Sequence, residues 1–388
     1  GAIHNNSTMT ITNSTFTGNS ASDEHGGAIY NTATAVLIDC AIAENTSSGA
    51  GGGVESANNT SKLILDGCSF TGNRAGNGGD SGSVTGGAED VRGSGKLYAN
   101  NTVFANNLAD LSGGVYSYGG GTYLMNCTIT GNIGRASNYR TRGQGMDIQN
   151  SYTYVVNCLI TNNYYGPNAN EIDIASNALA GNTANLIGRV GSSGDINYAS
   201  GVAADYNASV SIDENSYPVL VPALQTKEGS AYAKYAPVSA GGSAASGGVY
   251  ATYFDYSNPS NIKMGYKVSS SDESITALGN LTVPDAESAE SNKVTTYFEG
   301  TARAAGVIGA SGVGRPSLVG DSIYRTAAGT ANVKFVSDSA GTYYYQVTDS
   351  DVAPSADAIK AATTGVHGSG SVTAGTTATL PQPPASRA

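Results

Sequence analysis

Residues 127–132 read Cys127-Thr128-Ile129-Thr130-Gly131-Asn132, and this cassette decides the fold. A small residue is followed two positions later by an apolar residue, and three positions after that by asparagine. Six copies occur between residues 14 and 163, at intervals of 25 to 34 residues. A repeat of this length is typical of a solenoid, in which each repeat stacks on the previous one. The six asparagines are Asn19, Asn45, Asn73, Asn107, Asn132 and Asn163.

The residues around the apolar position predict two strands and a corner in every repeat. The small residue two positions earlier shares its parity, so both side chains face one side of a strand. The residue five positions earlier is always apolar but has the opposite parity. Between them lies Asn, Asp or Gly, the residue types that tolerate a left-handed backbone. The apolar positions are Phe16, Ile42, Phe70, Phe104, Ile129 and Ile160.

A glycine motif before each cassette predicts a third strand. It reads Gly26-Gly27-Ala28-Ile29 in one repeat and Gly113-Gly114-Val115 in another. Three short strands and three corners per repeat make one coil of a parallel β-helix, which we expect to be right-handed, as parallel crossovers are. The asparagine of each cassette then stacks on its counterpart in the next coil, and the amides form a ladder along the axis.

The pairing of the two motifs resembles the repeats of polymorphic outer-membrane proteins and related bacterial β-helix adhesins. The resemblance covers residues 1 to about 190 and rests on six cassettes in phase. It implies a secreted or surface-displayed bacterial protein, often one that acts in adhesion. It carries over no catalytic residue.

The rest of the chain predicts two further regions and a linker. We expect the β-helix to occupy residues 1–313, with irregular coils and a cap after about residue 190, because solenoid ends need a terminal unit. Residues 318–381 are similar to small Ig-like β-sandwich modules of Gram-positive surface proteins, and alternation in 333–336 and 343–347 predicts a hairpin. The Pro-rich residues 382–388 predict a linker, and we expect both ends to continue in a longer protein.

Composition limits the partners. The net charge of −11 argues against nucleic acid and against electrostatic docking to anionic membranes. No run is apolar enough to insert into a bilayer. The resemblance to surface-displayed β-helix proteins implies an extracellular location, secreted or attached to the cell surface. A strand edge left open at the first coil would allow self-assembly.

The four cysteines all lie inside the cassette. Two readings stay open: a stack of buried thiols, or disulfides between neighbouring coils. Neither C-x-x-C nor a nearby histidine provides the spacing of a zinc site, so the sequence predicts no metal and no cofactor.

Candidate binding residues lie where the repeat is broken, in the long coils around residues 74–96 and 135–142. The second insertion concentrates arginine in an acidic chain, and tyrosines follow in nearby coils. Tyr and Arg are preferred contact residues, and insertions in repeat proteins often line the binding face. We therefore expect a glycan, acidic in character, or an acidic host surface protein to bind here. The candidate residues are Arg135, Tyr139, Arg140, Arg142, Tyr164 and Tyr165.

An enzyme is the alternative to a non-catalytic adhesin. Parallel β-helices also carry polysaccharide lyases and glycoside hydrolases, so the fold alone does not choose. A hydrolase needs two carboxylates close together, at matching positions of adjacent coils. The sequence reveals no such ladder of carboxylates, and it predicts no catalytic residue.

Overall fold

The computed structural model describes residues 1–22, 25–76, 84–134, 144–149, 152–161, 163–165, 174–176, 179–187, 224–227, 230–235, 248–285, 287–310, 324–325, 333–336, 341–347, 356–363, 366–372 and 377–379. The chain forms two compact units, residues 1–313 and 314–388, and each is described by itself. Both are built from β-strands, and the only described α-helix has five residues.

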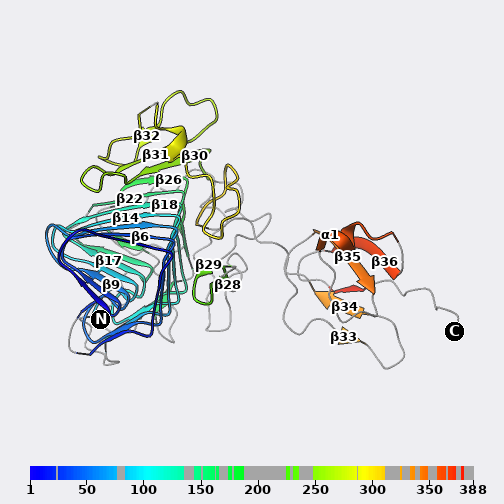
Figure 1. The fold of residues 1–388 in the computed structure, drawn as a ribbon, viewed down its shortest axis with the longest axis horizontal. Helices are drawn as coiled ribbons and strands as arrows, with labels where there is room; N and C mark the ends of the chain where they lie inside the picture. The colour runs from blue at the N-terminus through cyan, green and yellow to red at the C-terminus, as the bar shows by residue number, and fades with distance from the viewer. Residues whose placement is uncertain are drawn as a thin grey trace. The chain divides into compact units, whose positions relative to one another are not determined.

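The first unit is a parallel β-solenoid, which confirms the predicted fold class (Figure 1). Its strands stack into four sheets, here named A to D in the order in which the chain passes through them. Sheets A, B and C each have seven strands and sheet D has six. The prediction of three strands per coil was incomplete, because a two-residue strand follows each of the six cassette asparagines, and these strands form sheet D.

Sheet A contains β1 (Ile3–Asn5), β5 (Ile29–Asn31), β9 (Val54–Ser56), β13 (Glu89–Val91), β17 (Val115–Tyr118), β21 (Met146–Gln149) and β25 (Ile174–Ser176). Sheet B contains β2 (Met9–Thr12), β6 (Thr34–Ile38), β10 (Lys62–Asp66), β14 (Lys96–Asn100), β18 (Gly121–Met125), β22 (Tyr152–Val156) and β26 (Leu179–Thr183). Sheet C contains β3 (Thr15–Thr17), β7 (Ala41–Ala43), β11 (Ser69–Thr71), β15 (Val103–Ala105), β19 (Thr128–Thr130), β23 (Leu159–Thr161) and β27 (Leu186–Ile187). Sheet D contains β4 (Ser20–Ala21), β8 (Thr46–Ser47), β12 (Arg74–Ala75), β16 (Leu108–Ala109), β20 (Ile133–Gly134) and β24 (Tyr164–Tyr165).

The predicted register holds along the solenoid. Phe70 pairs with Ile42 on one side and with Phe104 on the other, and the two phenyl rings stack with centroids 5.1 Å apart. The four cysteines are free thiols buried behind these residues. The corner residues adopt the expected left-handed backbone, with positive φ at Asn13, Asp39, Gly67, Asn101, Asn126 and Asn157.

The predicted asparagine ladder is also confirmed. The Nδ2 atom of each amide donates to the Oδ1 atom of the amide in the next coil, as from Asn73 to Asn107 at 2.9 Å. The same nitrogen also donates to a backbone carbonyl of the previous coil, which for Asn107 is that of Phe70 at 3.0 Å. The buried amides therefore satisfy both their own polar atoms and the backbone at this corner. Such contacts join Asn19, Asn45, Asn73, Asn107, Asn132 and Asn163.

The two glycines of the motif are required for different physical reasons. Its first glycine, such as Gly86 with φ +66°, occupies a left-handed turn. The next glycine, Gly87, packs against the backbone of the following coil, where a Cβ atom would overlap the carbonyl oxygen of Gly113. Only glycine therefore allows the coils to stack at this corner.

Replacing Gly87 with alanine should lower the free energy of unfolding by about 3 kcal/mol, because backbone atoms cannot move aside for the added methyl group. Gly18→Ala is the matched control. Its position has a left-handed φ of +65° but open space around it, so the cost should be only about 1 kcal/mol. Urea denaturation followed by circular dichroism measures both. Equal costs for the two variants would contradict the packing explanation.

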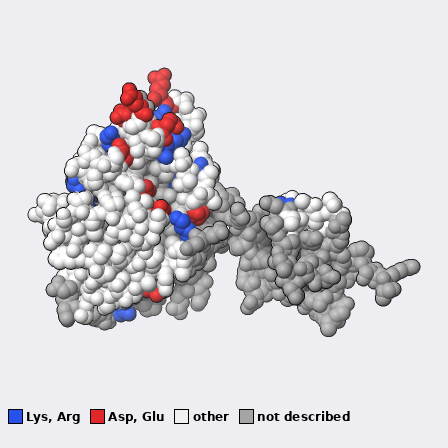
Figure 2. All heavy atoms as spheres, viewed as in Figure 1, with Lys and Arg blue, Asp and Glu red and all other residues white. Residues whose placement is uncertain are grey.

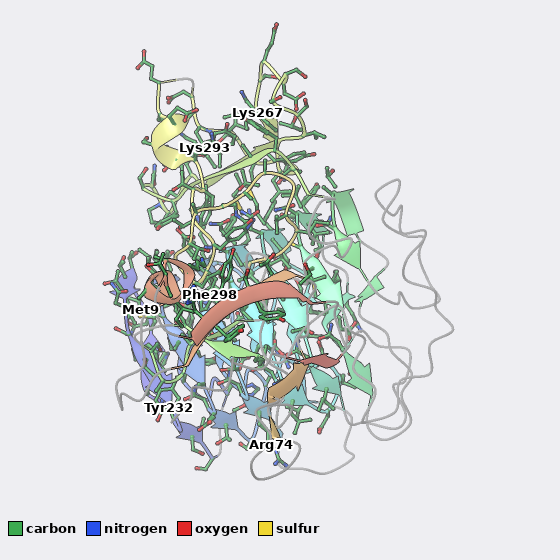
Figure 3. All side chains as sticks on the ribbon, turned by 90° about the vertical axis from the view of Figure 1, so that its right-hand side faces the viewer. Met9, Arg74, Tyr232, Lys267, Lys293 and Phe298 are labelled. Carbon is green, nitrogen blue, oxygen red and sulfur yellow. The ribbon has the colours of Figure 1, made fainter. Side chains whose placement is uncertain are left out.

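The described part of residues 224–310 differs from the coils expected there. Residues 248–310, here called the side layer, form antiparallel strands that lie against the outer face of sheet B (Figure 1). Phe298 packs on the outer face of sheet C, and Figure 3 places it closer to the coils than Lys267 and Lys293. The elements here are β28 (Gln225–Thr226), β29 (Lys234–Tyr235), β30 (Ala251–Asp255), β31 (Lys263–Lys267), β32 (Thr276–Ala277) and the 3-10 helix η5 (Glu290–Asn292).

The side layer is explained by the composition of sheet B. Its strands β6, β10, β14, β18 and β22 carry apolar residues on both faces. In β10, Leu65 points into the solenoid core while Ile64 points outward and is fully buried. Strands of this kind require cover on both sides. Outside the sheet, Ile64 belongs to a cluster with Phe254 and Met264 of the side layer.

The described residues of the second unit form two antiparallel sheets and one short helix. The predicted hairpin between residues 333–336 and 343–347 is wrong, because β34 pairs with β33 and β37, whereas β35 pairs with β36. Alternation predicts that a segment is a strand, but it does not choose the strand's partner. The elements are β33 (Tyr324–Arg325), β34 (Val333–Val336), β35 (Gly341–Val347), α1 (Ala356–Lys360), β36 (Val366–Val372) and β37 (Thr377–Thr379).

Candidate functional site

The predicted binding residues lie largely outside the described part of the chain. Arg135, Tyr139, Arg140 and Arg142 all fall in the undescribed range 135–143. Tyr164 and Tyr165 form β24, whose backbone pairs with β20, but their side chains lie outside the description. The insertion at 135–142 lies between β20 of sheet D and β21 of sheet A. The described part of residues 74–96 contains β12, β13 and the first residue of β14, so only the stretch between β12 and β13 interrupts the coil. Binding at these insertions stays a prediction.

A polar pocket lies elsewhere, between the solenoid and the side layer. Its volume is about 370 Å³, and its walls come from the ends of β10 and β14, from β30 and from residues 291–296. Figure 2 shows that charged side chains gather over the side layer, while the solenoid face in view carries few. We call this cavity the carboxylate pocket, because Asp66 and Asp255 both line it.

Asp66 ends β10 and receives a chain of amides that runs along the outside of the solenoid. Asn157 donates to Asn126 at 2.8 Å, and Asn126 donates to Asn100 at 2.9 Å. Asn100 in turn donates its Nδ2 hydrogen to Asp66 Oδ1 at 2.7 Å. Burial raises the pKa of Asp66 to about 6, although hydrogen bonds from Asn100 and Tyr256 oppose the rise. Asp66 can therefore hold a proton close to neutral pH.

Asp255 has the opposite character. Burial alone would raise its pKa, but hydrogen bonds from Ser257 and Lys263 outweigh that effect and keep the pKa below its ordinary value. Ser257 donates its backbone N–H at 3.0 Å and its hydroxyl at 2.6 Å, and Lys263 Nζ lies 3.4 Å from Oδ2. At pH values between the two pKa values, Asp255 is therefore ionised while Asp66 is still protonated. Two carboxyl groups whose pKa values are separated in this way can act as general acid and general base.

Asn101 adds an unused acceptor to the same pocket. Its side chain lines the cavity and is almost fully buried, and its Nδ2 group donates only a long bond of 3.4 Å to the carbonyl of Thr296. Among the described residues, no donor reaches its Oδ1 atom. A buried carbonyl oxygen without a partner costs free energy, so this atom points to a polar ligand or to water.

A second group of acids shows that the sequence reading of carboxylates was wrong. Glu55 and Asp90 occupy matching positions on adjacent strands of sheet A, and Asp147 follows two coils later. Only these strand registers make them neighbours, since the spacing from Glu55 to Asp90 includes a long insertion. The sequence signal was weak, because Glu89 takes the apolar position before Asp90 and the same column also contains Tyr30 and Tyr116.

The sheet A acids have neighbouring side chains as partners: Glu55 and Asp90 lie beside basic residues, and Asp147 accepts from Gln149 Nε2 at 3.3 Å. His25 Nδ1 lies 2.7 Å from Glu55 Oε2, and Arg92 Nε lies 2.9 Å from Asp90 Oδ1. Asp90 is fully buried, and burial raises its pKa to about 6 despite the charge of Arg92. Among the described residues, no group of three or more His, Cys, Asp or Glu is arranged to hold a metal ion. We therefore interpret this column as structural.

The described helices give no sign of a membrane span, since none is long and apolar enough to cross a bilayer. No protein-family model, no curated protein and no solved structure matches the chain. The fold assignment therefore rests on the strand pairing and the asparagine ladder themselves.

Proposed function

We propose that the chain belongs to an extracellular bacterial adhesin, and that the carboxylate pocket is a binding site for carbohydrate. The repeats support the adhesin class through their resemblance to surface-displayed β-helix proteins. Two antiparallel sheets in the second unit support a small Ig-like module, as in strings of surface domains. Host surface proteins remain candidate partners for the insertions at 74–96 and 135–142.

The unpartnered Oδ1 atom of Asn101 carries the carbohydrate proposal. Asn101 lines the carboxylate pocket together with Asn100, Asn292, Ser257 and Tyr256. Hydroxyl groups of a sugar both donate and accept hydrogen bonds, so they suit a wall of amides and carboxylates. A volume of about 370 Å³ falls in the lower part of the range of small-molecule sites.

Replacing Asn101 with glycine should weaken glycan binding about tenfold, because one buried hydrogen bond to the sugar is lost. Glycine suits the left-handed φ of 51° at this corner, as Gly67 does in the previous coil. Asn13→Gly is the matched control, since Asn13 occupies the same corner in the first coil and does not line the pocket. A glycan array identifies the ligand, and titration calorimetry measures the affinity.

A third variant locates the site. Alanine at Arg135, Arg140 and Arg142 together should leave this binding intact if the pocket holds the glycan. Loss of binding in that variant, with Asn101→Gly unaffected, would transfer the site to the insertion. Absence of glycan binding by the unchanged protein would contradict the proposed function itself.

Glycoside hydrolysis is the second candidate, and the opposed pKa shifts of Asp66 and Asp255 favour it. In this role Asp66 would protonate the leaving oxygen as general acid. Asp255 would serve as the ionised partner, either activating water or attacking the sugar. Release of reducing ends from the glycan that binds, and its loss in Asp66→Asn, would distinguish an enzyme from a binding module.

A further inference from the structure

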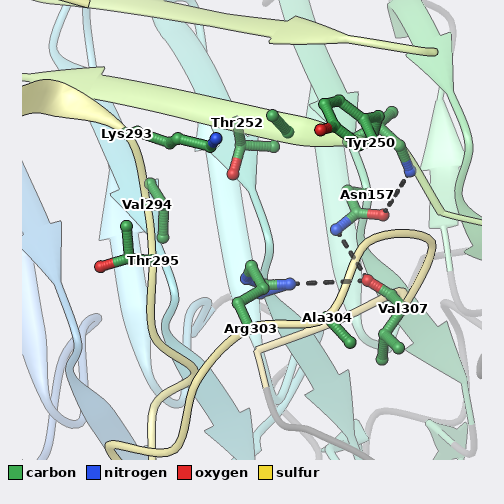
Figure 4. Close-up of a pocket in the computed structure, with 11 residues that line it drawn as sticks. Asn157, Tyr250, Thr252, Lys293, Val294, Thr295, Arg303, Ala304 and Val307 are labelled. Atoms are coloured by element: carbon green, nitrogen blue, oxygen red, sulfur yellow. Dashed lines mark hydrogen bonds between the residues drawn. The ribbon is translucent and has the colours of Figure 1, made fainter. Parts of the chain in front are cut away.

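A second pocket adjoins the carboxylate pocket and has the opposite charge. Its volume is about 220 Å³, and Lys293 and Arg303 both line it (Figure 4). The segment Lys293-Val294-Thr295 is common to the walls of both pockets, so the two cavities are neighbours along one stretch of chain. No described Asp or Glu lines the second pocket. We call it the cationic pocket.

Arg303 is held firmly but is not neutralised by the atoms that hold it. Its terminal nitrogens donate to the carbonyls of Gly309 at 2.7 Å and Val307 at 3.5 Å, and its guanidinium lies 4.5 Å from the centre of the Tyr297 ring. Its Nε atom is buried and has no hydrogen-bond partner among the described residues. Burial lowers the pKa of Arg303 to about 10, so the group stays charged at neutral pH.

Two acids lie near the cationic pocket, but neither lines it. Glu299 acts on Arg303 and favours its charged form, but it does not line the cavity. Glu290 approaches Lys293 only to 4.0 Å, and its side chain is 83% exposed, so water screens this pair. A cavity lined by Lys293 and Arg303 and by no described acid favours an anion, because hydrogen bonds to charged groups are the strong ones.

We propose that the cationic pocket binds the anionic group of an acidic sugar, a carboxylate or a sulfate ester. This inference rests on the proposed carbohydrate function and specifies the class of glycan. The ionised Asp255 of the carboxylate pocket would repel an anion, so the acidic sugar occupies the cationic pocket and an adjoining sugar occupies the other. Thr252 and Thr295 supply further hydroxyl groups to the cationic pocket.

The test compares one oligosaccharide in three forms: with carboxylate groups, with the carboxylates reduced to alcohols, and with sulfate esters instead. The unchanged protein should bind the carboxylated or the sulfated form at least about tenfold more tightly than the neutral form, as one charged hydrogen bond implies. Whichever anionic form binds more tightly identifies the source of the charge. Calorimetry at fixed ionic strength provides the affinities.

Lys293→Met should remove this preference, because it deletes the charge and keeps the length of the side chain, and Lys293→Arg should keep it. Arg303→Lys tests the second cation, and its ammonium group can still donate to the carbonyls of Val307 and Gly309. Equal binding of all three forms by the unchanged protein, or an unaltered preference in Lys293→Met, would overturn the anionic subsite while carbohydrate binding stood. Binding of none of the forms would overturn both proposals.

Discussion

Replacing Asn107 with alanine is expected to lower the free energy of unfolding by about 4 kcal/mol. The buried amide makes four hydrogen bonds. Its Oδ1 atom accepts from the backbone and the side chain of Asn73, each at 2.9 Å, and its Nδ2 atom donates to Phe70 and Asn132. Truncation leaves the Asn73 donors and the Phe70 carbonyl buried without partners, at about 1–3 kcal/mol for each orphaned group. Urea denaturation monitored by circular dichroism gives the value.

Asn19→Ala provides the matched control for the ladder. Asn19 is the first amide of the ladder in this sequence and is partly exposed, and its side chain donates to Asn45 at 2.8 Å. Its loss should cost only about 1 kcal/mol. If Asn107→Ala and Asn19→Ala were equally stable, the buried hydrogen bonds of the ladder would contribute nothing to stability. The interpretation of the cassette asparagines as structural residues would then be wrong.

Asp66→Asn is expected to raise the free energy of unfolding at pH 7.5 by about 2 kcal/mol. The pKa of Asp66 in the folded protein is about 6, above the ordinary value of 3.8, because burial disfavours the charge. A raised folded pKa contributes stability that is full below the unfolded value and is lost as pH rises through about 6. Above pH 6 the wild type carries the cost of the buried charge. The shift in pKa corresponds to about 3 kcal/mol. Solvent screening at this partly exposed residue reduces the expected effect to about 2 kcal/mol.

Asparagine is neutral at every pH, so the advantage of the variant should vanish near pH 4. Its carbonyl can still accept the hydrogen bond from Asn100. Asp255→Asn is the matched control and has the opposite sign. The lowered pKa of Asp255 means that its charge stabilises the fold, so its removal should destabilise the protein at pH 7.5. A loss of stability in Asp66→Asn at pH 7.5 would refute the raised pKa.

A carboxylate that weakens its own fold is typical of a functional site, because sites are optimised for chemistry rather than for stability. The same variants therefore separate the two candidate functions. An adhesin should keep much of its glycan affinity in Asp66→Asn, whereas a hydrolase should lose turnover while the glycan still binds.

The core of the solenoid could be predicted because the repeat is local. Phe70 and Phe104 stand in the same place in their cassettes, so stacking the coils brings them together without further information. The left-handed corners at Asn101 and Asn126 followed in the same way, from residue types that tolerate positive φ. Sheet D was missed because Arg74 and Ala75 have no apolar pattern of their own and take their extended form from pairing with neighbouring coils.

The candidate sites depend on contacts that no repeat predicts. Asp66 and Asp255 lie far apart in the chain and meet only because the side layer folds back over sheet B. Lys293 and Arg303 likewise line one pocket only in the folded chain. The apolar outer face of sheet B, with Ile64 and the stacked rings of Tyr98 and Tyr123, was the available signal that something covers it.

The sequence by itself determined the solenoid, its register and its asparagine ladder, because each of these needs only neighbouring coils of the same pattern. The tertiary structure alone decided where polar groups are buried without partners. Burial is a property of what covers a residue, and here the cover comes from residues 248–310, whose docking follows no period. The physical reason for the difference is that stacking energy repeats along the chain, whereas the desolvation of Asp66, Asn101 and Arg303 depends on a single contact between distant segments.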